Sequence, residues 1–386
     1  MKKAELKTPA PLKLKNTQLL CTLERPYSQP EKYEEIFRES MKEIMTWHRE
    51  KSSFYASLLK KLNFSIENWQ GDLENIPIIP ADFFKLHEVK SIPDQDVILH
   101  LTSSGTTGQK SQIFFDEWSL GCAQLMVDAI FAEYKWTTKQ PSNYLLYSYE
   151  PQPNLKLGTS YTDNFLLKYS PPQEVVYALK SNGKGGHDFD LYGCIRALQS
   201  FAEQSLPVRI FGFPAFFYFT IQRMIDLGLP ALKLHSDSLV FLGGGWKGHS
   251  NQEINKRDFY KITEAQLGIP NERLRDGFGS VEHSIPYVEC RNHNFHVPVY
   301  SKVIIRDLST LKPLGYGKQG FLHFISPYIT SIPAHSIMMG DLAILHPPQD
   351  CGCDIATDWF SILGRAGISK NKSCAIAASE MLRSFS

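Results

Sequence analysis

The sequence predicts an α/β protein, and three observations carry this prediction. Short apolar segments typical of strands, at residues 144–147, 208–211 and 239–242, alternate with helical stretches through the middle of the chain. A charged, helix-periodic region over residues 30–62 precedes them. From Phe295 onward the pattern turns strand-rich, with segments at 297–305, 320–325 and 342–345. A chain of 386 residues is long enough to bury a large core around such elements.

The helical region near the N-terminus has an apolar stripe at three- and four-residue steps, which predicts a packing face. Its members are Tyr33, Ile36, Phe37, Met41, Ile44 and Met45. Further along, the aromatic-rich segment 211–219 is compatible with core packing and also with the lining of a channel for a long alkyl chain. No internal repeat, linker or clean domain boundary stands out.

Composition narrows the class of protein. The 41 basic and 40 acidic residues nearly cancel, so nothing favours nucleic acid or an anionic membrane as a partner. The longest apolar stretch, residues 210–222, lies between two arginines and falls short of the roughly 20 residues of a membrane span. No apolar segment follows the N-terminal lysines, and the seven cysteines are an odd number, widely scattered. We therefore expect a soluble protein of the reducing cytoplasm, without a membrane span.

A hydroxyl- and glycine-rich loop follows the apolar run 97–99, which predicts a strand. The loop is formed by Ser103, Ser104, Gly105, Thr106, Thr107, Gly108, Gln109 and Lys110. Hydroxyl groups, exposed backbone N–H groups and one lysine suit a polyphosphate. The spacing differs from that of a Walker A loop, because only two residues separate the glycines and Gln109 precedes the lysine. A polar surface turn is the other interpretation.

This loop resembles the phosphate loop of adenylate-forming enzymes, and four later segments match that superfamily in order. They are the glycine turn Gly243, Gly244 and Gly245 after a strand, the segment Phe278, Gly279, Ser280, Val281 and Glu282, the pair Gly340–Asp341, and the pair Gly364–Arg365. The resemblance implies that ATP is bound. The glycine turn and Phe278 would surround adenine, Asp341 would hold the ribose, and Arg365 would contact ribose or phosphate. Glu282 would hold Mg²⁺, and Ser280 stands one residue before the position of the family's usual hydroxyl.

A set of cysteines and histidines predicts a structural zinc site. Cys290 and His296 lie six residues apart, and Cys351 and Cys353 follow in a Cys-Gly-Cys sequence. Three sulfurs and one imidazole complete a tetrahedral site, although His293 competes for the nitrogen position and unrelated reduced cysteines are the alternative. Phenylacetate–CoA ligase-like members of the superfamily resemble this chain in carrying such a set.

The C-terminal end departs from the usual adenylate-forming pattern. These enzymes continue past the Gly-Arg hinge into a small mobile domain with a catalytic lysine, whereas only 21 residues follow Arg365 here. We therefore expect a large adenylate-forming domain over residues 1–365 and a mobile tail over 366–386. Lys110, Lys247, Lys370 and Lys372 are candidates to replace the missing lysine. In the tail, Lys370 and Lys372 lie four and two residues before Cys374 and favour its thiolate, the attacking form of a thiol. The alternative is that Cys374 is a small apolar residue in a terminal helix.

The tail, the loop and the segment Gly364–Lys370 resemble the acyl-protein synthetase family, the ligase subunits of the fatty acid reductase complex of luminous bacteria. The resemblance implies activation of a long-chain fatty acid such as tetradecanoate by ATP and Mg²⁺, then transfer to Cys374 as a thioester. It also implies an acyl reductase subunit, which uses NADPH to make aldehyde for luciferase, and an acyl-transferase or thioesterase subunit. The alternatives are a ligase that passes the acyl group to coenzyme A or a carrier protein, and a catalytically silent acyl-binding subunit.

Overall fold

The computed structural model describes residues 13–102, 112–151, 166–246 and 249–366. The chain divides into two compact units. Unit 1 comprises Met1–Glu133, Gly279–Tyr287 and Asn294–Ser386, and unit 2 comprises Tyr134–Phe278 and Val288–His293. The predicted boundary at residue 365 and the tail beyond it stay predictions, because residues 367–386 lie outside the described part.

The N-terminal part of unit 1 is helical, as the sequence predicted. Its α-helices are α1 (Lys15–Cys21), α2 (Glu34–Lys51), α3 (Ser53–Lys61), α4 (Phe83–Leu86) and α5 (Glu117–Glu133). Ser52 separates α2 from α3, and its hydroxyl accepts a hydrogen bond from Tyr55 N at 3.4 Å, as an N-cap residue does. The predicted stripe is a packing face, since the side chains of Phe37, Met41, Ile44 and Met45 are at most 1% exposed.

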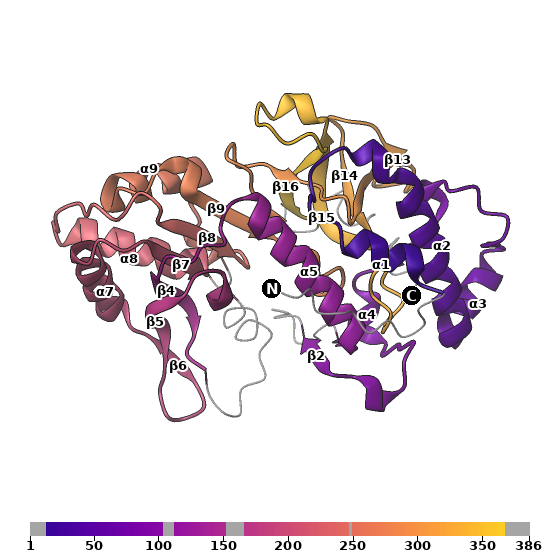
Figure 1. Ribbon diagram of the computed structural model, residues 1–386, viewed down its shortest axis with the longest axis horizontal. Helices are drawn as coiled ribbons and strands as arrows, with labels where there is room; N and C mark the ends of the chain where they lie inside the picture. The colour runs from indigo at the N-terminus through magenta and orange to yellow at the C-terminus, as the bar shows by residue number, and fades with distance from the viewer. Residues whose placement is uncertain (1–12, 103–111, 152–165, 247–248, 367–386) are drawn as a thin grey trace. The chain divides into compact units, whose positions relative to one another are not determined.

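The second half of unit 1 is a mainly antiparallel sheet of seven strands (Figure 1). Its strands are β1 (Ile79–Pro80), β11 (Phe295–His296), β12 (Lys302–Arg306), β13 (Pro313–Leu314), β14 (Gln319–Ile325), β15 (Ser336–His346) and β16 (Trp359–Arg365). Their order is β11-β16-β15-β14-β12-β13, and β1 pairs with β15 in parallel. The continuous strand predicted over 297–305 was wrong. Pro298 has no N–H for a ladder, and its carbonyl instead accepts a turn bond from Ser301 N at 3.0 Å.

A hairpin in unit 1 frames the predicted phosphate loop. It consists of β2 (Leu99–Thr102) and β3 (Gln112–Phe115), in antiparallel register with Thr102 opposite Gln112. The sequence predicted a strand over residues 97–99, whereas β2 begins at Leu99. The start is later because a 3-10 turn over Asp94–Asp96 precedes the strand. The loop residues themselves lie outside the described part of the chain.

Unit 2 is an α/β layer whose central strands are parallel. The strands are β4 (Ser142–Tyr149), β5 (Pro172–Ser181), β6 (His187–Phe189), β7 (Val208–Gly212), β8 (Leu239–Gly243), β9 (Leu274–Phe278) and β10 (Tyr287–Val288), in the order β10-β9-β8-β7-β4-β5-β6. The helices are α7 (Leu191–Glu203), α8 (Pro214–Asp226) and α9 (Lys256–Leu267). The predicted strands at 144–147, 208–211 and 239–242 are confirmed as parts of β4, β7 and β8.

The core of unit 2 explains the aromatic segment 211–219. Phe217 is buried in the cluster formed by α7, α8, α9 and the inner strands, and Phe216 and Tyr218 pack against the same cluster. These contacts favour core packing for the segment. The short 3-10 helices of the two units are Pro30–Tyr33, Leu73–Asn75, Asp94–Asp96, Leu167–Tyr169, Ser250–Gln252, Asn271–Arg273 and Pro348–Asp350. Among the described helices, none combines the length and apolar character that crossing a membrane requires.

Candidate active site

Asp341, predicted to hold the ribose, and Arg365, predicted to contact ribose or phosphate, face each other on two paired strands. Asp341 lies within β15 and pairs in register with Arg365, the last residue of β16. The Arg365 Nε atom is 3.6 Å from Asp341 Oδ1. The Asp341 side chain is 10% exposed, whereas the Arg365 side chain is 65% exposed. The sheet therefore holds the acid in place and leaves the cation accessible to a ligand.

An irregularity in β16 sets this pairing. The register shifts between Leu342 and Ala343, which face Gly364 and Ile362, so that Leu363 is an extra residue in β16. Gly364 has φ +124°, a backbone conformation that side chains with a Cβ rarely adopt. The bulge turns the end of the strand and brings Arg365 opposite Asp341. The predicted Gly-Arg pair is thus a glycine that permits the bulge and an arginine that the bulge orients.

Glu282 lies in a turn of unit 1 that follows β9 along the chain. Ser280 O accepts hydrogen bonds from Ser284 N at 2.7 Å and His283 N at 3.3 Å, which closes the turn. Glu282 is 5% exposed and makes no hydrogen bond or ion pair with another described residue. No cation among the described residues pairs with this carboxylate, and carboxylate oxygens are ligands that Mg²⁺ favours. Glu282 therefore fits the magnesium role that the sequence assigned to it.

The Ser280 hydroxyl is the second unused polar group of this turn. Its Oγ atom is shielded from solvent and has no hydrogen-bond partner among the described residues. The preceding residue, Gly279, is exposed. A buried hydroxyl that makes no hydrogen bond within the protein can still donate one to a bound oxyanion. The Ser280 hydroxyl therefore fits the contact with a phosphate group that the sequence suggested.

Three charged groups and burial determine the state of Asp341. Burial raises the pKa of its carboxyl above the ordinary value, Arg365 opposes that rise, and the negative charge of Glu282 adds to it. Lys85, a lysine of α4 that sequence analysis did not single out, also lowers this pKa. Unit 1 thus concentrates two buried acids and two cations in one region.

In unit 2 the glycine turn and the predicted aromatic residue lie on adjacent strands. β8 and β9 are parallel, with Gly243 opposite Gly277, so Phe278 follows directly beside the turn that begins at Gly243. Gly244 and Gly245 are exposed, and Phe278 is half-buried. These residues form one edge of the parallel sheet, at the carboxyl ends of β8 and β9. In open α/β sheets this is the edge at which ligands bind.

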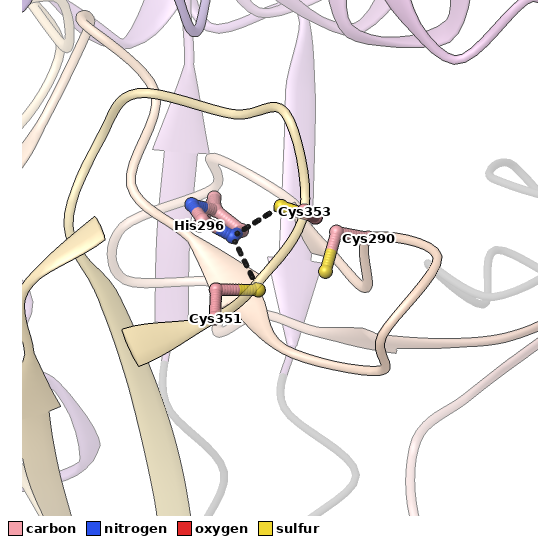
Figure 2. A group of neighbouring side chains, drawn as sticks. All are labelled: Cys290, His296, Cys351 and Cys353. Atoms are coloured by element: carbon pink, nitrogen blue, oxygen red, sulfur yellow. Dashed lines mark hydrogen bonds between the residues drawn. The ribbon is translucent and has the colours of Figure 1, made fainter. Parts of the chain in front are cut away.

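The four predicted zinc ligands form one cluster, with their ligand atoms all within 4.8 Å of one another (Figure 2). His296 Nε2 is 3.2 Å from Cys351 Sγ and 3.2 Å from Cys353 Sγ. Cys290 and His296 are almost fully buried, and Cys353 is half-buried. Zinc ligands about 2.3 Å from the metal for sulfur and about 2.0 Å for nitrogen fit a group of this size. The donor set thus suits a closed structural zinc site.

Hydrogen bonds around the cluster prepare its donors for a metal. His296 Nδ1 lies 2.7 Å from Thr357 O, a carbonyl that can only accept, so this nitrogen carries the proton and Nε2 has the lone pair. N–H groups donate to all three sulfurs: Asn292 N to Cys290, the Asn294 amide to Cys351, and Ile355 N to Cys353, at 3.1 to 3.4 Å. Such bonds stabilise thiolates.

His296, and not His293, is the histidine of this cluster. The His293 ring lies beside Glu289, with Nδ1 at 3.5 Å from the carboxylate, and its Nε2 is 2.9 Å from the Asn271 amide. The alternative nitrogen ligand is therefore excluded. Gly352, with φ +71°, permits the tight turn through which Cys351 and Cys353 both reach the cluster.

Several predicted residues lie outside the described part of the chain. They are Ser103, Ser104, Gly105, Thr106, Thr107, Gly108 and Lys110 of the phosphate loop, the candidate lysines Lys247, Lys370 and Lys372, and Cys374 of the tail. Sequence reasoning missed Lys85, the amide of Asn294 and the carbonyl of Thr357. Only Lys85 had a visible signal, as a cation shortly after the apolar segment 76–80.

A scan against protein-family models matches residues 20–383 to the family described as acyl-protein synthetase, LuxE. The chain belongs to the acyl-protein synthetase family. It is 23% identical over 364 residues to a long-chain-fatty-acid–luciferin-component ligase of Aliivibrio fischeri, covering 92% of this chain and 90% of that protein. A ligase of the same name from Vibrio harveyi is 23% identical over 310 residues, covering 80% and 79% of the two chains. Membership in the acyl-protein synthetase family confirms the predicted ligase class.

Solved structures confirm the predicted fold. An open conformation of 2-hydroxyisobutyryl-CoA ligase, in complex with 2-HIB-AMP and CoA, superposes with a TM-score of 0.64 at 12% identity, covering 89% of this chain and 72% of that one. The same ligase in its postadenylation state gives a TM-score of 0.63 at 12% identity, covering 92% and 73%. The chain therefore has the fold of adenylate-forming enzymes.

Proposed function

We propose that this chain activates a long-chain fatty acid with ATP and then carries the acyl group on its own cysteine. In the first step the carboxylate of the fatty acid attacks the α-phosphorus of ATP, and acyl-AMP and pyrophosphate form. In the second step the Cys374 thiolate attacks the acyl carbonyl carbon, and AMP leaves. The observation that carries the proposal is the grouping of Glu282, Asp341 and Arg365 in one site of an acyl-protein synthetase.

The described residues divide the nucleotide between them in this proposal. Asp341 accepts hydrogen bonds from the ribose hydroxyls, and Arg365 contacts ribose or phosphate. Gly243 to Gly245 and Phe278 surround adenine, and the unpartnered Ser280 hydroxyl donates to the α-phosphate. The loop from Ser103 to Lys110 holds the β- and γ-phosphates. Glu282 would hold Mg²⁺, which neutralises phosphate charge when bound.

The acyl thioester on Cys374 serves for delivery. Lys370 and Lys372 favour the thiolate of Cys374, and a thioester keeps the acyl group reactive toward a reductase. The relatives are named luciferin-component ligases. We therefore include in the proposal an acyl reductase and an acyl-transferase or thioesterase as partners in a fatty acid reductase complex.

Zinc is the metal we propose for Cys290, His296, Cys351 and Cys353. With all four positions occupied by protein atoms, a metal there stabilises the fold and takes no part in adenylation. The cluster links β11, through His296, to the turn that precedes β16, and these two strands also pair directly. Zinc would therefore strengthen the end of the sheet whose other end presents Arg365.

Labelling of the pure protein with radioactive tetradecanoic acid tests the proposal. We expect label on the protein only with ATP and Mg²⁺, release by hydroxylamine, and loss in Cys374→Ser. Ser373→Ala is the matched control, since it changes the neighbouring position and keeps the thiol. Equal thioester labelling of Cys374→Ser would contradict the acceptor assignment. Rapid pyrophosphate release without protein label would instead indicate coenzyme A or a carrier protein as acceptor, and absence of both would indicate a catalytically silent subunit.

A further inference from the structure

The turn that contains Glu282 is held by hydrogen bonds on both sides of this residue. The peptide N–H that follows it, from His283, donates to Ser280 O at 3.3 Å. The peptide carbonyl that precedes it, from Val281, accepts a hydrogen bond from Ser284 Oγ at 2.7 Å. Ser284 has φ +54°, a left-handed conformation that costs free energy for a residue other than glycine. The turn therefore keeps the main chain of Glu282 in one conformation against local strain.

The buried ring of His283 attaches this turn to the rest of unit 1. It stacks on Phe324 of β14, with ring centroids 4.5 Å apart and planes at 13°. Nε2 lies 2.9 Å from the Tyr287 hydroxyl, which donates its own proton to Ser301 Oγ at 3.0 Å. Nε2 therefore carries the ring proton and donates, and Nδ1 accepts from Ser326 Oγ at 3.4 Å. Both ring nitrogens are used within the protein, so neither is left for a metal.

The main chain of the same histidine is held as well. The Tyr328 hydroxyl donates to His283 O at 3.1 Å. Tyr328 lies in the segment 326–335, which joins β14 to β15 and is buried throughout. The same segment contacts the hairpin of β2 and β3, because Ser331 Oγ donates to Phe114 O. One buried segment thus supports both this turn and the hairpin that frames the predicted phosphate loop.

A magnesium ligand has to be held in place, and Glu282 is held through its main chain. Mg²⁺ demands a nearly ideal octahedral arrangement of oxygen ligands, so a misplaced carboxylate binds it poorly. Glu282 is 5% exposed and makes no hydrogen bond or ion pair with another described residue. The position of its carboxylate therefore depends on the turn, and the turn depends on the contacts of His283.

We propose that His283 is a positioning residue that holds the Glu282 carboxylate where it binds the Mg²⁺ of the ATP complex. The inference rests on the proposed function and adds to it a residue that contacts neither metal nor nucleotide. His283 acts through the peptide group that joins it to Glu282, because its ring and its carbonyl are both fixed. Without these contacts the turn would have to be ordered each time Mg²⁺ and ATP bind, and that ordering would lower their affinity.

Calorimetric binding of ATP to the full chain tests the inference without turnover, because fatty acid is left out. Each protein is titrated with ATP once with Mg²⁺ and once with EDTA, so that the two Kd values separate the metal's contribution from that of the nucleotide. His283→Ala removes the ring. Tyr328→Phe keeps the ring and removes only the hydroxyl that holds its carbonyl.

Each variant has a matched control elsewhere in the molecule. His335→Ala is the control for His283→Ala, because both histidines are completely buried, and the ring of His335 contacts the Tyr55 hydroxyl at 2.9 Å. Tyr144→Phe is the control for Tyr328→Phe. It removes a buried hydroxyl that donates to a carbonyl oxygen of unit 2, Ser170 O, at 2.8 Å.

We expect His283→Ala to raise the Kd of ATP with Mg²⁺ about tenfold or more, as the loss of an outer partner of a metal ligand does. The Kd with EDTA should stay unchanged. Tyr328→Phe should raise the Kd with Mg²⁺ about threefold, since it removes one neutral hydrogen bond. His335→Ala and Tyr144→Phe should leave both Kd values unchanged, although they also lower stability.

An unchanged Kd with Mg²⁺ in His283→Ala would overturn the inference. An equal rise in His335→Ala would also overturn it, because the histidine would then act only on folding, and so would an equal rise with Mg²⁺ and with EDTA. If His283→Ala does not fold, Tyr328→Phe decides by the same criteria. A wild type whose affinity for ATP does not depend on Mg²⁺ would instead refute the magnesium role of Glu282 in the proposed function.

Discussion

Asp341 and Arg365 are cross-strand partners in β15 and β16, and the bulge at Leu363 is what places them opposite each other. A buried acid is thereby paired with a cation that is mostly exposed. This arrangement stabilises the carboxylate and still leaves the guanidinium accessible. The ribose and phosphate roles proposed for the two residues depend on this relationship, and so does the first prediction.

Asp341→Asn should weaken ATP binding. The amide replaces a charged acceptor by a neutral one, and a charged hydrogen bond contributes about 1.5 to 3 kcal/mol. We expect the KM for ATP to rise about tenfold or more, with little change in the KM for fatty acid. Asp358→Asn is the control, because that half-buried carboxylate, directly before β16, accepts a hydrogen bond from Tyr316 at 3.1 Å. An unchanged KM for ATP would remove Asp341 from the nucleotide site.

Glu282→Gln should make the protein more stable and less active. The neutral amide removes a buried charge that has no partner among the described residues, so unfolding should become harder by about 1 kcal/mol. Pyrophosphate release should fall about 100-fold or more, since a bound metal contributes several kcal/mol to such a step. Glu43→Gln provides the contrast, because Glu43 accepts hydrogen bonds from Asn16 and Thr17 at the start of α1. That variant should lose stability, and a parallel loss in Glu282→Gln would contradict the prediction.

Cys351→Ser should lose the proposed zinc. Removal of one of four ligands should lower metal affinity more than about 100-fold, beyond the effect of changing an outer partner. Metal analysis of the wild type should find one zinc per chain, and a chelator should lower its thermal unfolding midpoint. Cys194→Ser is the control, since Cys194 is buried in the core of unit 2, away from the cluster. A wild type that is folded, active and free of metal would end the zinc assignment.

Stability should fall as the pH drops below about 6.5, because several histidines are buried uncharged. His335 stacks on His48 with ring centroids 5.3 Å apart, and its Nε2 is 2.9 Å from the Tyr55 hydroxyl. Burial lowers the pKa of His335 to about 3, so the unfolded chain takes up the proton first as the pH falls. At pH 5 this group alone should cost about 2 kcal/mol of unfolding free energy relative to neutral pH.

Urea unfolding at pH 7 and pH 5 checks this pH dependence. For each variant, the quantity to compare is the difference in unfolding free energy between pH 7 and pH 5. The absolute free energies are not compared, because His335→Gln also alters packing. We expect a smaller change in His335→Gln than in the wild type. His235→Gln, which changes a histidine that is 29% exposed, should leave the change as it is. An identical change in the His335 variant would show that this residue does not contribute.

Most of the helices and strands that could be predicted have a clear periodic pattern of apolar residues. The helices over 30–62 and the strands within β4, β7, β8, β14 and β15 follow the apolar pattern of their own residues. The misplaced strands have local causes that hydrophobicity does not report. Pro298 interrupts one strand, and the turn at Asp94–Asp96 delays the start of another.

Short motifs predicted the residues of the adenylate-forming site. Their order along the chain, and the Cys-x-Cys spacing, are properties of the sequence. The sequence could not decide between His296 and His293 as the metal ligand, because both histidines lie within a few residues of Cys290. Pairing of β11 with β16 decides it, since Phe295 and His296 are held opposite Phe360 and Trp359.

The sequence by itself determined the fold class, the family and most of the candidate residues, because periodicity and motif order are local and sequential. Only the tertiary structure decided which charges meet. The bulge in β16 sets Arg365 against Asp341, and the turn at Ser280 leaves Glu282 buried without a partner among the described residues. Strand register and the burial of charge depend on contacts between distant segments, and no local pattern in the chain encodes them.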